Sequence, residues 1–114
     1  MLPRAKRLTA AREFTRIYRT GQSAKSRLFR VSWEPSRSGN AHVAVVVGRK
    51  LSTRAVVRNL AKRRVRAAVA QLFPNLHPVN LIIQLQTQPI DAFAFSTITR
   101  ELRELLCRMN ILKD

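Results

Sequence analysis

Apolar residues follow helical spacing in three stretches of the chain. These stretches cover residues 9–21, about 53–73 and 91 to about 109, where apolar side chains recur every three or four positions. Thr9 is suited to cap the first stretch and Gly21 to end it, because a hydroxyl can satisfy free backbone N–H groups and glycine tolerates the turn after a helix. The pattern therefore predicts three helices.

The two later helices each have one apolar side. At about 100° per residue, the apolar side of the middle helix consists of Val57, Ala61, Val65, Ala68 and Leu72. The apolar side of the last helix consists of Phe95, Ile98, Leu102, Leu105 and Leu106. A stripe of this width indicates that each helix packs against other elements.

Three further stretches have the patterns of β-strands. Residues 27–34 alternate between an apolar face and a polar or basic face, residues 41–48 are rich in valine, and residues 79–86 form a third apolar run. The turn-forming residues 35–40 predict that the first two strands pair as a hairpin. The order of helices and strands predicts an α+β protein, a two-layer α/β sandwich with most of the helical mass on one face.

Positive charge dominates the composition. The 114 residues include 22 lysines and arginines against 6 acids, which gives a formal net charge of +16, and 17 of the 22 cations are arginine. Because 46% of the residues are apolar, the charge belongs to a folded domain and not to a disordered basic tail. Arginine favours forked contacts with phosphate, so nucleic acid is the leading partner.

Nothing in the sequence suggests secretion or a membrane. Cys107 is the single cysteine, and no run of 18 or more apolar residues occurs. The basic start of the chain lacks the apolar segment of a signal peptide. We expect a cytoplasmic protein with no membrane partner. We also expect one nucleic-acid-binding domain over residues 1–114, with a flexible basic N-terminus at 1–8 and a C-terminal tail at 109–114.

The middle helix concentrates charge on one side. This side carries Arg58, Asn59, Lys62, Arg63 and Arg66. Eight cations and no acid lie between positions 49 and 66, although like charges one turn apart destabilise a helix. A solvated basic face is the plain explanation. A phosphate backbone is the better complement to so many unbalanced cations.

The arrangement of these residues resembles the signature of the bacterial ribonuclease P protein subunit. The likeness rests on "RN" at 58–59, "KR" at 62–63 and Arg66, preceded by "GRKLSTRAVV". It extends through "RLTAAREFTRIYRTG", "RLFRVSW" and "HVAVVVGRK", over roughly Arg7 to Leu106. The resemblance implies the order α-β-β-β-α-β-α and a four-stranded sheet. It also implies a left-handed β-α-β crossover, although such connections are generally right-handed.

The resemblance also implies a function. Members of this family bind a catalytic RNA, and the holoenzyme removes the 5′ leader from precursor tRNA with an active site and Mg²⁺ held by the RNA. The chain would then have ribonuclease P RNA and precursor tRNA as partners and no DNA, and would itself hold no catalytic residue, metal or tightly bound cofactor. The residues facing the RNA subunit would be Arg49, Lys50, Arg54, Arg58, Asn59, Lys62, Arg63, Arg64 and Arg66. A cleft for the leader would be lined by Arg12, Phe14, Tyr18, Phe29 and Arg30.

The sequence departs from the family pattern in two places. Leu60 stands where the family usually has a third basic residue after "RN", and Arg64 stands where it usually has an apolar one. Because positions 60 and 64 lie one turn apart on the same flank, we hypothesise that the charge has moved along the helix. Ser32 or Trp33 occupies a place near the cleft where many members have tyrosine.

Other functions stay open on the residues alone. One is a ribosomal or structural RNA-binding protein without a part in catalysis, and another is a DNA-binding regulator. The strands argue against a helix-turn-helix regulator, which needs two short adjacent helices. The aromatic residues proposed for the cleft are also consistent with ordinary core packing. The six acids are scattered, so no cluster of carboxylates around protein-held metal ions is expected.

Overall fold

Three α-helices and four strands form the part of the chain that the computed structural model describes, residues 11–47, 54–86 and 95–113. In chain order the elements are α1 (Ala11–Thr20), β1 (Gln22–Lys25), β2 (Phe29–Pro35), β3 (His42–Val46), α2 (Ala55–Leu72), a 3₁₀ turn η2 (Phe73–Asn75), β4 (Val79–Leu85) and α3 (Phe95–Arg108). This order confirms the one implied by the resemblance. Thr9 and the basic terminus at 1–8 lie outside the described residues.

The four strands form one mixed sheet in the order β1-β2-β4-β3. β2 pairs antiparallel with both β1 and β4, whereas β3 pairs parallel with β4. The predicted hairpin between 27–34 and 41–48 is therefore wrong, because β4 lies between these strands. The central place suits β4, since six of its seven residues are buried and a strand covered on both faces is apolar throughout. The β3–α2–β4 connection joins parallel strands as expected, and its left-handedness stays a prediction.

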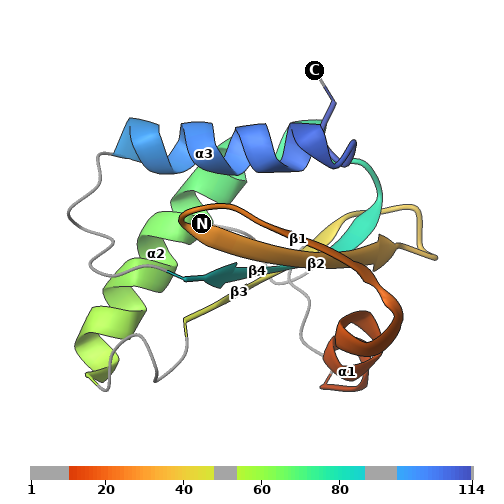
Figure 1. Cartoon of the computed structure of the whole chain (residues 1–114), viewed down its shortest axis with the longest axis horizontal. Coiled ribbons are helices and arrows are strands. Elements are labelled where there is room, and N and C mark those ends of the chain that lie inside the picture. Colours follow the sequence, from red (N-terminus) through yellow and green to blue (C-terminus); the bar gives the residue numbers. More distant parts are fainter. Residues whose placement is uncertain (1–10, 48–53, 87–94, 114) are drawn as a thin grey trace.

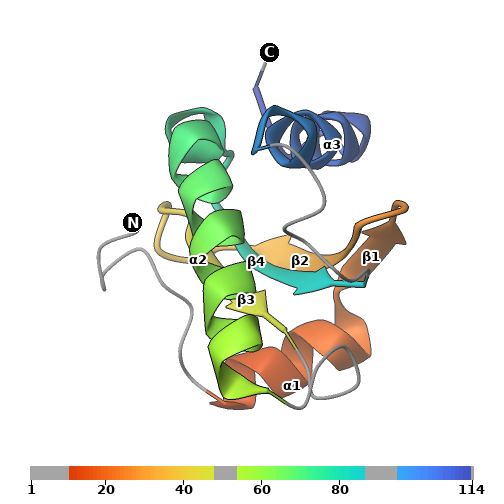
Figure 2. The same cartoon turned by 90° about the vertical axis from the view of Figure 1, so that its left-hand side faces the viewer.

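The helices cover the two faces of the sheet unequally. In Figures 1 and 2, α3 lies over one face and α1 over the opposite face, while α2 runs beside the sheet from the level of α1 to the level of α3. Side chains of α2 and α3 share a core with one face of the sheet, whose largest members include Phe29, Leu81, Ile83 and Leu85. On the other face, Ile17 of α1 packs on Ile82. The predicted α+β sandwich with most helical mass on one face is confirmed.

The junction between α1 and β1 requires a glycine. The Gly21 N–H donates to the Ile17 carbonyl oxygen at 2.9 Å and so ends the helix. A Cβ at Gly21 would lie 2.6 Å from the carbonyl oxygens of both Ile17 and Trp33. The backbone of α1 therefore approaches β2 more closely at this point than any side chain would permit.

The end of the chain after α3 is packed against the domain. Asn110 adopts a left-handed backbone conformation (φ 62°), which asparagine tolerates, and the Ile111 N–H donates back to the Leu106 carbonyl oxygen at 3.1 Å. Ile111 and Leu112 are buried, and Leu112 forms a β-bridge with Leu76. The predicted tail at 109–114 is thus an integral part of the core as far as it is described.

The apolar stripe predicted for the last helix is correct except at its start. Ile98, Leu102, Leu105 and Leu106 are buried, but Phe95 is 38% exposed because it is the first residue of α3.

Among the described helices, none combines the length and the apolar character that a membrane span requires.

Candidate nucleic-acid interface

One side of α2 anchors the helix to the core. Its buried residues are Ala61, Val65, Ala68, Val69 and Leu72. The periodicity predicted four of these five, and it also placed Val57 on this side, where the structure leaves it half-buried. Because these residues fix the rotation of α2, they also decide which of its other side chains face outward.

The cations of α2 occupy one flank of the helix, which we call the cation flank: Arg58, Asn59, Lys62, Arg63 and Arg66. At about 100° per residue, this flank spans roughly 140°, and its Arg58 edge falls in projection between the buried residues Val65 and Val69. Asn59 and Arg63 are exposed, and the other three are half-buried, so their alkyl stems cover apolar surface while their charged ends reach solvent. The structure therefore brings the predicted core of the RNA-binding motif together on one continuous surface.

The local sequence does little to stabilise this helix. The first turn of α2 has no acidic residue, and its N-cap residue Arg54 makes no capping hydrogen bond with its side chain. Cations near a helix N-terminus oppose the helix dipole. The packing of the buried side must therefore stabilise α2. The excess positive charge destabilises the helix unless an anion is bound to it.

The cation flank borders a hollow of about 440 Å³. Among the described residues, the hollow is lined by Asn59, Lys62, Arg63, Arg66 and Ala67. Three cationic side chains and one amide thus converge on a concave surface. Such a surface can accept phosphate oxygens from more than one side.

The neighbouring flank of α2 is apolar, which the sequence analysis missed. Val56 is 76% exposed and Leu60 is 41% exposed, and they lie one turn apart. Arg64 lies one turn beyond Leu60 and is half-buried. The cation flank therefore ends at Arg63, and the shift of charge from position 60 to position 64 stays a prediction.

The remaining residues of the predicted RNA-facing set precede α2 in the sequence. Arg49 and Lys50 fall outside the described residues. Arg54 is exposed, and its carbonyl oxygen accepts the Arg58 N–H at 3.1 Å. In both views the N-terminal end of α2 lies at the level of α1 (Figures 1 and 2), so this basic end projects past the sheet on the side of α1.

The sheet face that carries α1 has three rows of side chains, set by the strand register. The first row contains Lys25, Arg30, Gln84 and Val46. The middle row contains Ser23, Ser32, Ile82 and Ala44. The third row contains Glu34, Asn80 and His42. The face thus passes from a basic end, across a middle row of Ile82 and smaller side chains, to an end with the acid Glu34.

Four of the residues predicted for the leader cleft belong to α1 or to the basic row. Arg12 and Tyr18 are exposed and Phe14 is half-buried on α1, and Arg30 is exposed on β2. Partial burial raises the pKa of the Tyr18 hydroxyl, and the positive charge of Arg30 opposes this shift. Tyr18 and Arg30 are therefore within electrostatic range of each other, and both side chains are exposed.

Phe29 does not line this face, and its prediction is wrong. The side chain has 0% exposure and belongs to the core shared with α2 and α3. Alternation along β2 turns Phe29, Val31 and Trp33 to that core and Arg30 to the face of α1. Ser32, on the α1 side, is itself only 4% exposed.

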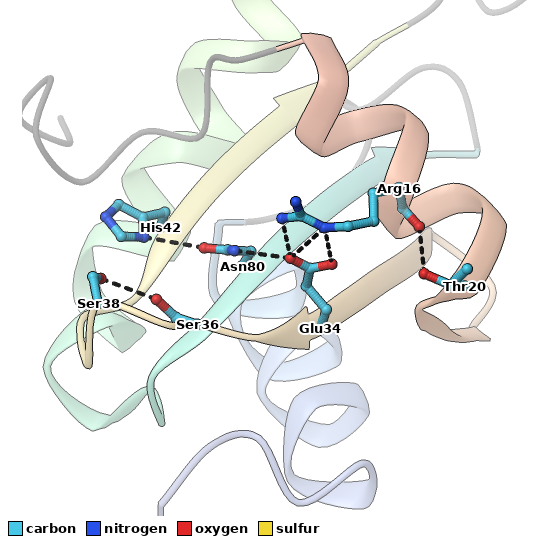
Figure 3. A network of polar contacts seen from close by, with 7 residues as sticks. All are labelled: Arg16, Thr20, Glu34, Ser36, Ser38, His42 and Asn80. Atoms are coloured by element: carbon cyan, nitrogen blue, oxygen red, sulfur yellow. Dashed lines mark hydrogen bonds and ion pairs between the residues drawn. The ribbon is translucent and has the colours of Figure 1, made fainter.

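A chain of polar contacts closes the acidic end of this face (Figure 3). Arg16 of α1 donates from Nε to both Glu34 carboxylate oxygens, at 2.9 and 3.1 Å, and from Nη2 at 2.5 Å. The Asn80 amide nitrogen donates to the same carboxylate at 3.2 Å, and the Asn80 amide oxygen lies 3.1 Å from His42 Nδ1. The Arg16 guanidinium, and to a smaller extent Asn80, lower the pKa of Glu34 against the opposing effect of burial.

Metal-binding groups do not gather in the part of the chain that the structure describes. Within it, no three His, Cys, Asp or Glu side chains come together in a way that could hold a metal ion. His42 contacts Asn80 instead. The two surfaces offer cations, amides and the exposed ring of Tyr18.

A cation flank on a helix anchored to a mixed four-stranded sheet defines the chain as a nucleic-acid-binding α+β protein. The comparison with protein families narrows this class, since the family model described as Ribonuclease P matches residues 2–110. The chain belongs to the ribonuclease P protein family.

Similar proteins span nearly the same length. The chain is 30% identical over 116 residues to the ribonuclease P protein component of Rippkaea orientalis, in a match that covers 97% of this chain and 91% of that protein. It is 32% identical over 113 residues to the ribonuclease P protein component of Symbiobacterium thermophilum, in a match that covers 98% of this chain and 97% of that protein.

Solved structures share the fold. The RNase P protein of Staphylococcus aureus superimposes with a TM-score of 0.83 at 24% identity, over 96% of this chain and 100% of that chain. The RNase P protein of Thermotoga maritima gives a TM-score of 0.81 at 24% identity, over 90% and 96% of the two chains.

Proposed function

We propose that the chain acts as the protein component of ribonuclease P, binding the catalytic RNA subunit through the cation flank of α2 and assisting removal of the 5′ leader of precursor tRNA. The observation that carries this proposal is the separation of charge and core on α2. Lys62, Arg63 and Arg66 line one concave surface, while Ala61 and Val65 are fully buried on the other side. The family and the names of the relatives favour this role over that of a ribosomal RNA-binding protein.

The chemistry of cleavage is assigned to the RNA. The acids of the chain do not form a site for catalytic metal ions within the described residues, so no step is assigned to a metal on this chain. Mg²⁺ would be bound by the RNA subunit. The protein would contribute by neutralising phosphates, which lowers the repulsion between the RNA subunit and its substrate.

The face of α1 is the second part of the proposal, as the surface for the single-stranded leader. Single-stranded RNA binds to surfaces that combine stacking rings with cations. Tyr18 supplies a ring that is 50% exposed, and Arg30 supplies an exposed cation within electrostatic range of it. Phe14 extends the apolar part of this surface on the same side of α1.

Reconstitution tests the proposal. The protein would be added to a bacterial ribonuclease P RNA with precursor tRNA at a low Mg²⁺ concentration, where the RNA alone cleaves slowly. We expect a higher cleavage rate at the mature 5′ end. A protein that binds the RNA without increasing cleavage would instead support the ribosomal or structural alternative and overturn the proposed function.

A further inference from the structure

The contact between α1 and the sheet combines an apolar cluster with the ion pair between Arg16 and Glu34. Ile17 and Ile82 are its two buried apolar residues, with Phe14, Ala44 and Val46 partly buried around them. The floor under the helix is formed by Ser32, Ile82 and Ala44, of which only Ile82 is large. So small a contact does not by itself fix the angle of the helix about its own axis.

The polar part lies on one flank of α1. Taking Ile17 as the residue that points at the sheet, about 100° per residue places Arg16 roughly 100° to one side of it. Tyr18 falls roughly 100° to the other side, and Phe14 about 60° to that same side. Ile17 therefore serves as a pivot between an anchored flank and a flank that carries the aromatic residues.

The hydrogen bonds of the anchored flank have a fixed direction. An ionised carboxylate only accepts hydrogen bonds, so Glu34 receives those from Arg16 and from the Asn80 amide nitrogen. The Asn80 amide oxygen then faces His42, and His42 must carry a proton on Nδ1 to donate to it. The Glu34 carboxylate is the acceptor on which the bonds from Arg16 and Asn80 converge, and the Arg16 guanidinium lowers its pKa.

We propose that Glu34 is a positioning residue, which holds Arg16 and so sets the rotation of α1 that presents Tyr18 and Phe14 to the RNA leader. The ion pair also occupies Arg16. The cation available to the leader is therefore on the opposite row of the sheet face, where Arg30 is exposed. This inference rests on the proposed function, and it adds a residue that would not itself touch the leader.

The test compares substrates that differ only in the leader. Glu34→Gln keeps the size of the side chain and removes its charge. Glu13→Gln is the matched control, since Glu13 is a half-buried acid on α1 that acts on Arg16 through its charge but belongs to no hydrogen bond of the polar chain. The holoenzyme would be assayed with precursor tRNA carrying a leader of several nucleotides and with a substrate carrying one leader nucleotide. Affinity for the RNA subunit would be measured in parallel.

We expect Glu34→Gln to raise KM for the long-leader substrate by roughly three- to tenfold, as is typical for loss of a coupled contact. KM for the one-nucleotide leader and affinity for the RNA subunit should not change, and Glu13→Gln should match the wild type. Arg16→Ala breaks the same ion pair from the solvent side and should reproduce the effect. The charge swap Arg16→Glu with Glu34→Arg should restore most of the leader dependence.

The outcomes separate the two proposals. Equal KM values for the Glu34→Gln and Glu13→Gln proteins on the long leader, or no recovery in the charge swap, would overturn the positioning role. A loss of affinity for the RNA subunit in step with the loss on the substrate would show general destabilisation and would also overturn it. A wild-type protein with no leader dependence would instead contradict the leader-binding part of the proposed function.

Discussion

The cation flank of α2 makes a prediction about salt. Replacing Lys62 and Arg66 together by alanine removes two of the cations that border the hollow and leaves the buried side of the helix intact. Each phosphate contact contributes a slope of about 0.7–0.9 to the dependence of log affinity on log salt. The double variant should therefore lower this slope by about 1.4–1.8 if each cation binds one phosphate.

The loss of affinity follows from the same slope. If the phosphate contribution vanishes near 1 M salt, the double variant should bind the RNA subunit about 15–30-fold more weakly at 0.15 M salt and only about 3-fold more weakly at 0.5 M. Fluorescence anisotropy with labelled ribonuclease P RNA at several monovalent salt concentrations and fixed Mg²⁺ measures both values. Each substitution also favours the helix slightly, since alanine is the best helix former, so unfolding of α2 does not explain a loss.

The matched control removes two arginines elsewhere. Arg100 and Arg103 are exposed on α3, so replacing both by alanine makes the same change in net charge away from the cation flank. The salt slope of this control should equal that of the wild type. Phosphate binding by this flank would be refuted if the Lys62 and Arg66 double variant had the same slope of log affinity against log salt as the wild type. It would also be refuted if the control lost as much slope as the double variant.

Four further predictions concern single residues. Phe29→Ala should lower the free energy of unfolding by about 3–5 kcal/mol in urea titrations, because the ring is fully buried; a loss below about 1 kcal/mol would contradict its place in the core. Gly21→Ala should cost about 2–3 kcal/mol, since its Cβ would meet two backbone carbonyl oxygens at 2.6 Å, and an unchanged Tm would contradict that close approach. Leu60→Arg should raise the salt slope for RNA binding by about 1, and no change would show that position 60 faces no phosphate. The lowered pKa of Glu34 stabilises the fold above the ordinary glutamate pKa of about 4.3, and this contribution disappears as the pH falls through the pKa of the folded state. The difference in unfolding free energy between the wild type and Glu34→Gln should therefore become smaller below that pH. A difference that stays constant with pH would contradict the ion pair.

Periodicity predicted the helices well because each one buries a single side. Ala61, Val65, Ala68 and Leu72 recur at helical spacing, and the structure buries all four. Their spacing alone was therefore enough to orient the cation flank. The exposed pair Val56 and Leu60 was missed because apolar residues outside the main stripe give no signal of their own in a periodicity analysis.

Strand pairing could not be predicted in the same way. The turn after β2 indicated a hairpin with β3, but the partner of β2 on that side is β4, which follows α2 in the chain. Local signals carry no information on such distant pairing. The same applies to the contact between Arg16 and Glu34, which joins a helix to a strand across 18 positions.

The assignment of Phe29 shows a different limit. Alternation correctly grouped this residue with Val31 and Trp33 on one face of β2. It did not show which face would meet α2 and α3 and which would meet α1. That choice depends on the packing of helices elsewhere in the chain, and the resemblance to the family supplied the wrong answer at this one position.

The place of β4 in the sheet also bears on how the protein is made. β3 has β4 as its partner in the sheet, and α2 is synthesised between them, so a growing chain displays its arginines before the scaffold that orients them exists. Pairing across such a long segment slows folding relative to local contacts. Because a ligand that binds the folded state alone stabilises it, an RNA that fits the finished helix would favour completion of the sheet. Assembly of the ribonucleoprotein and the last step of folding are in this sense coupled events.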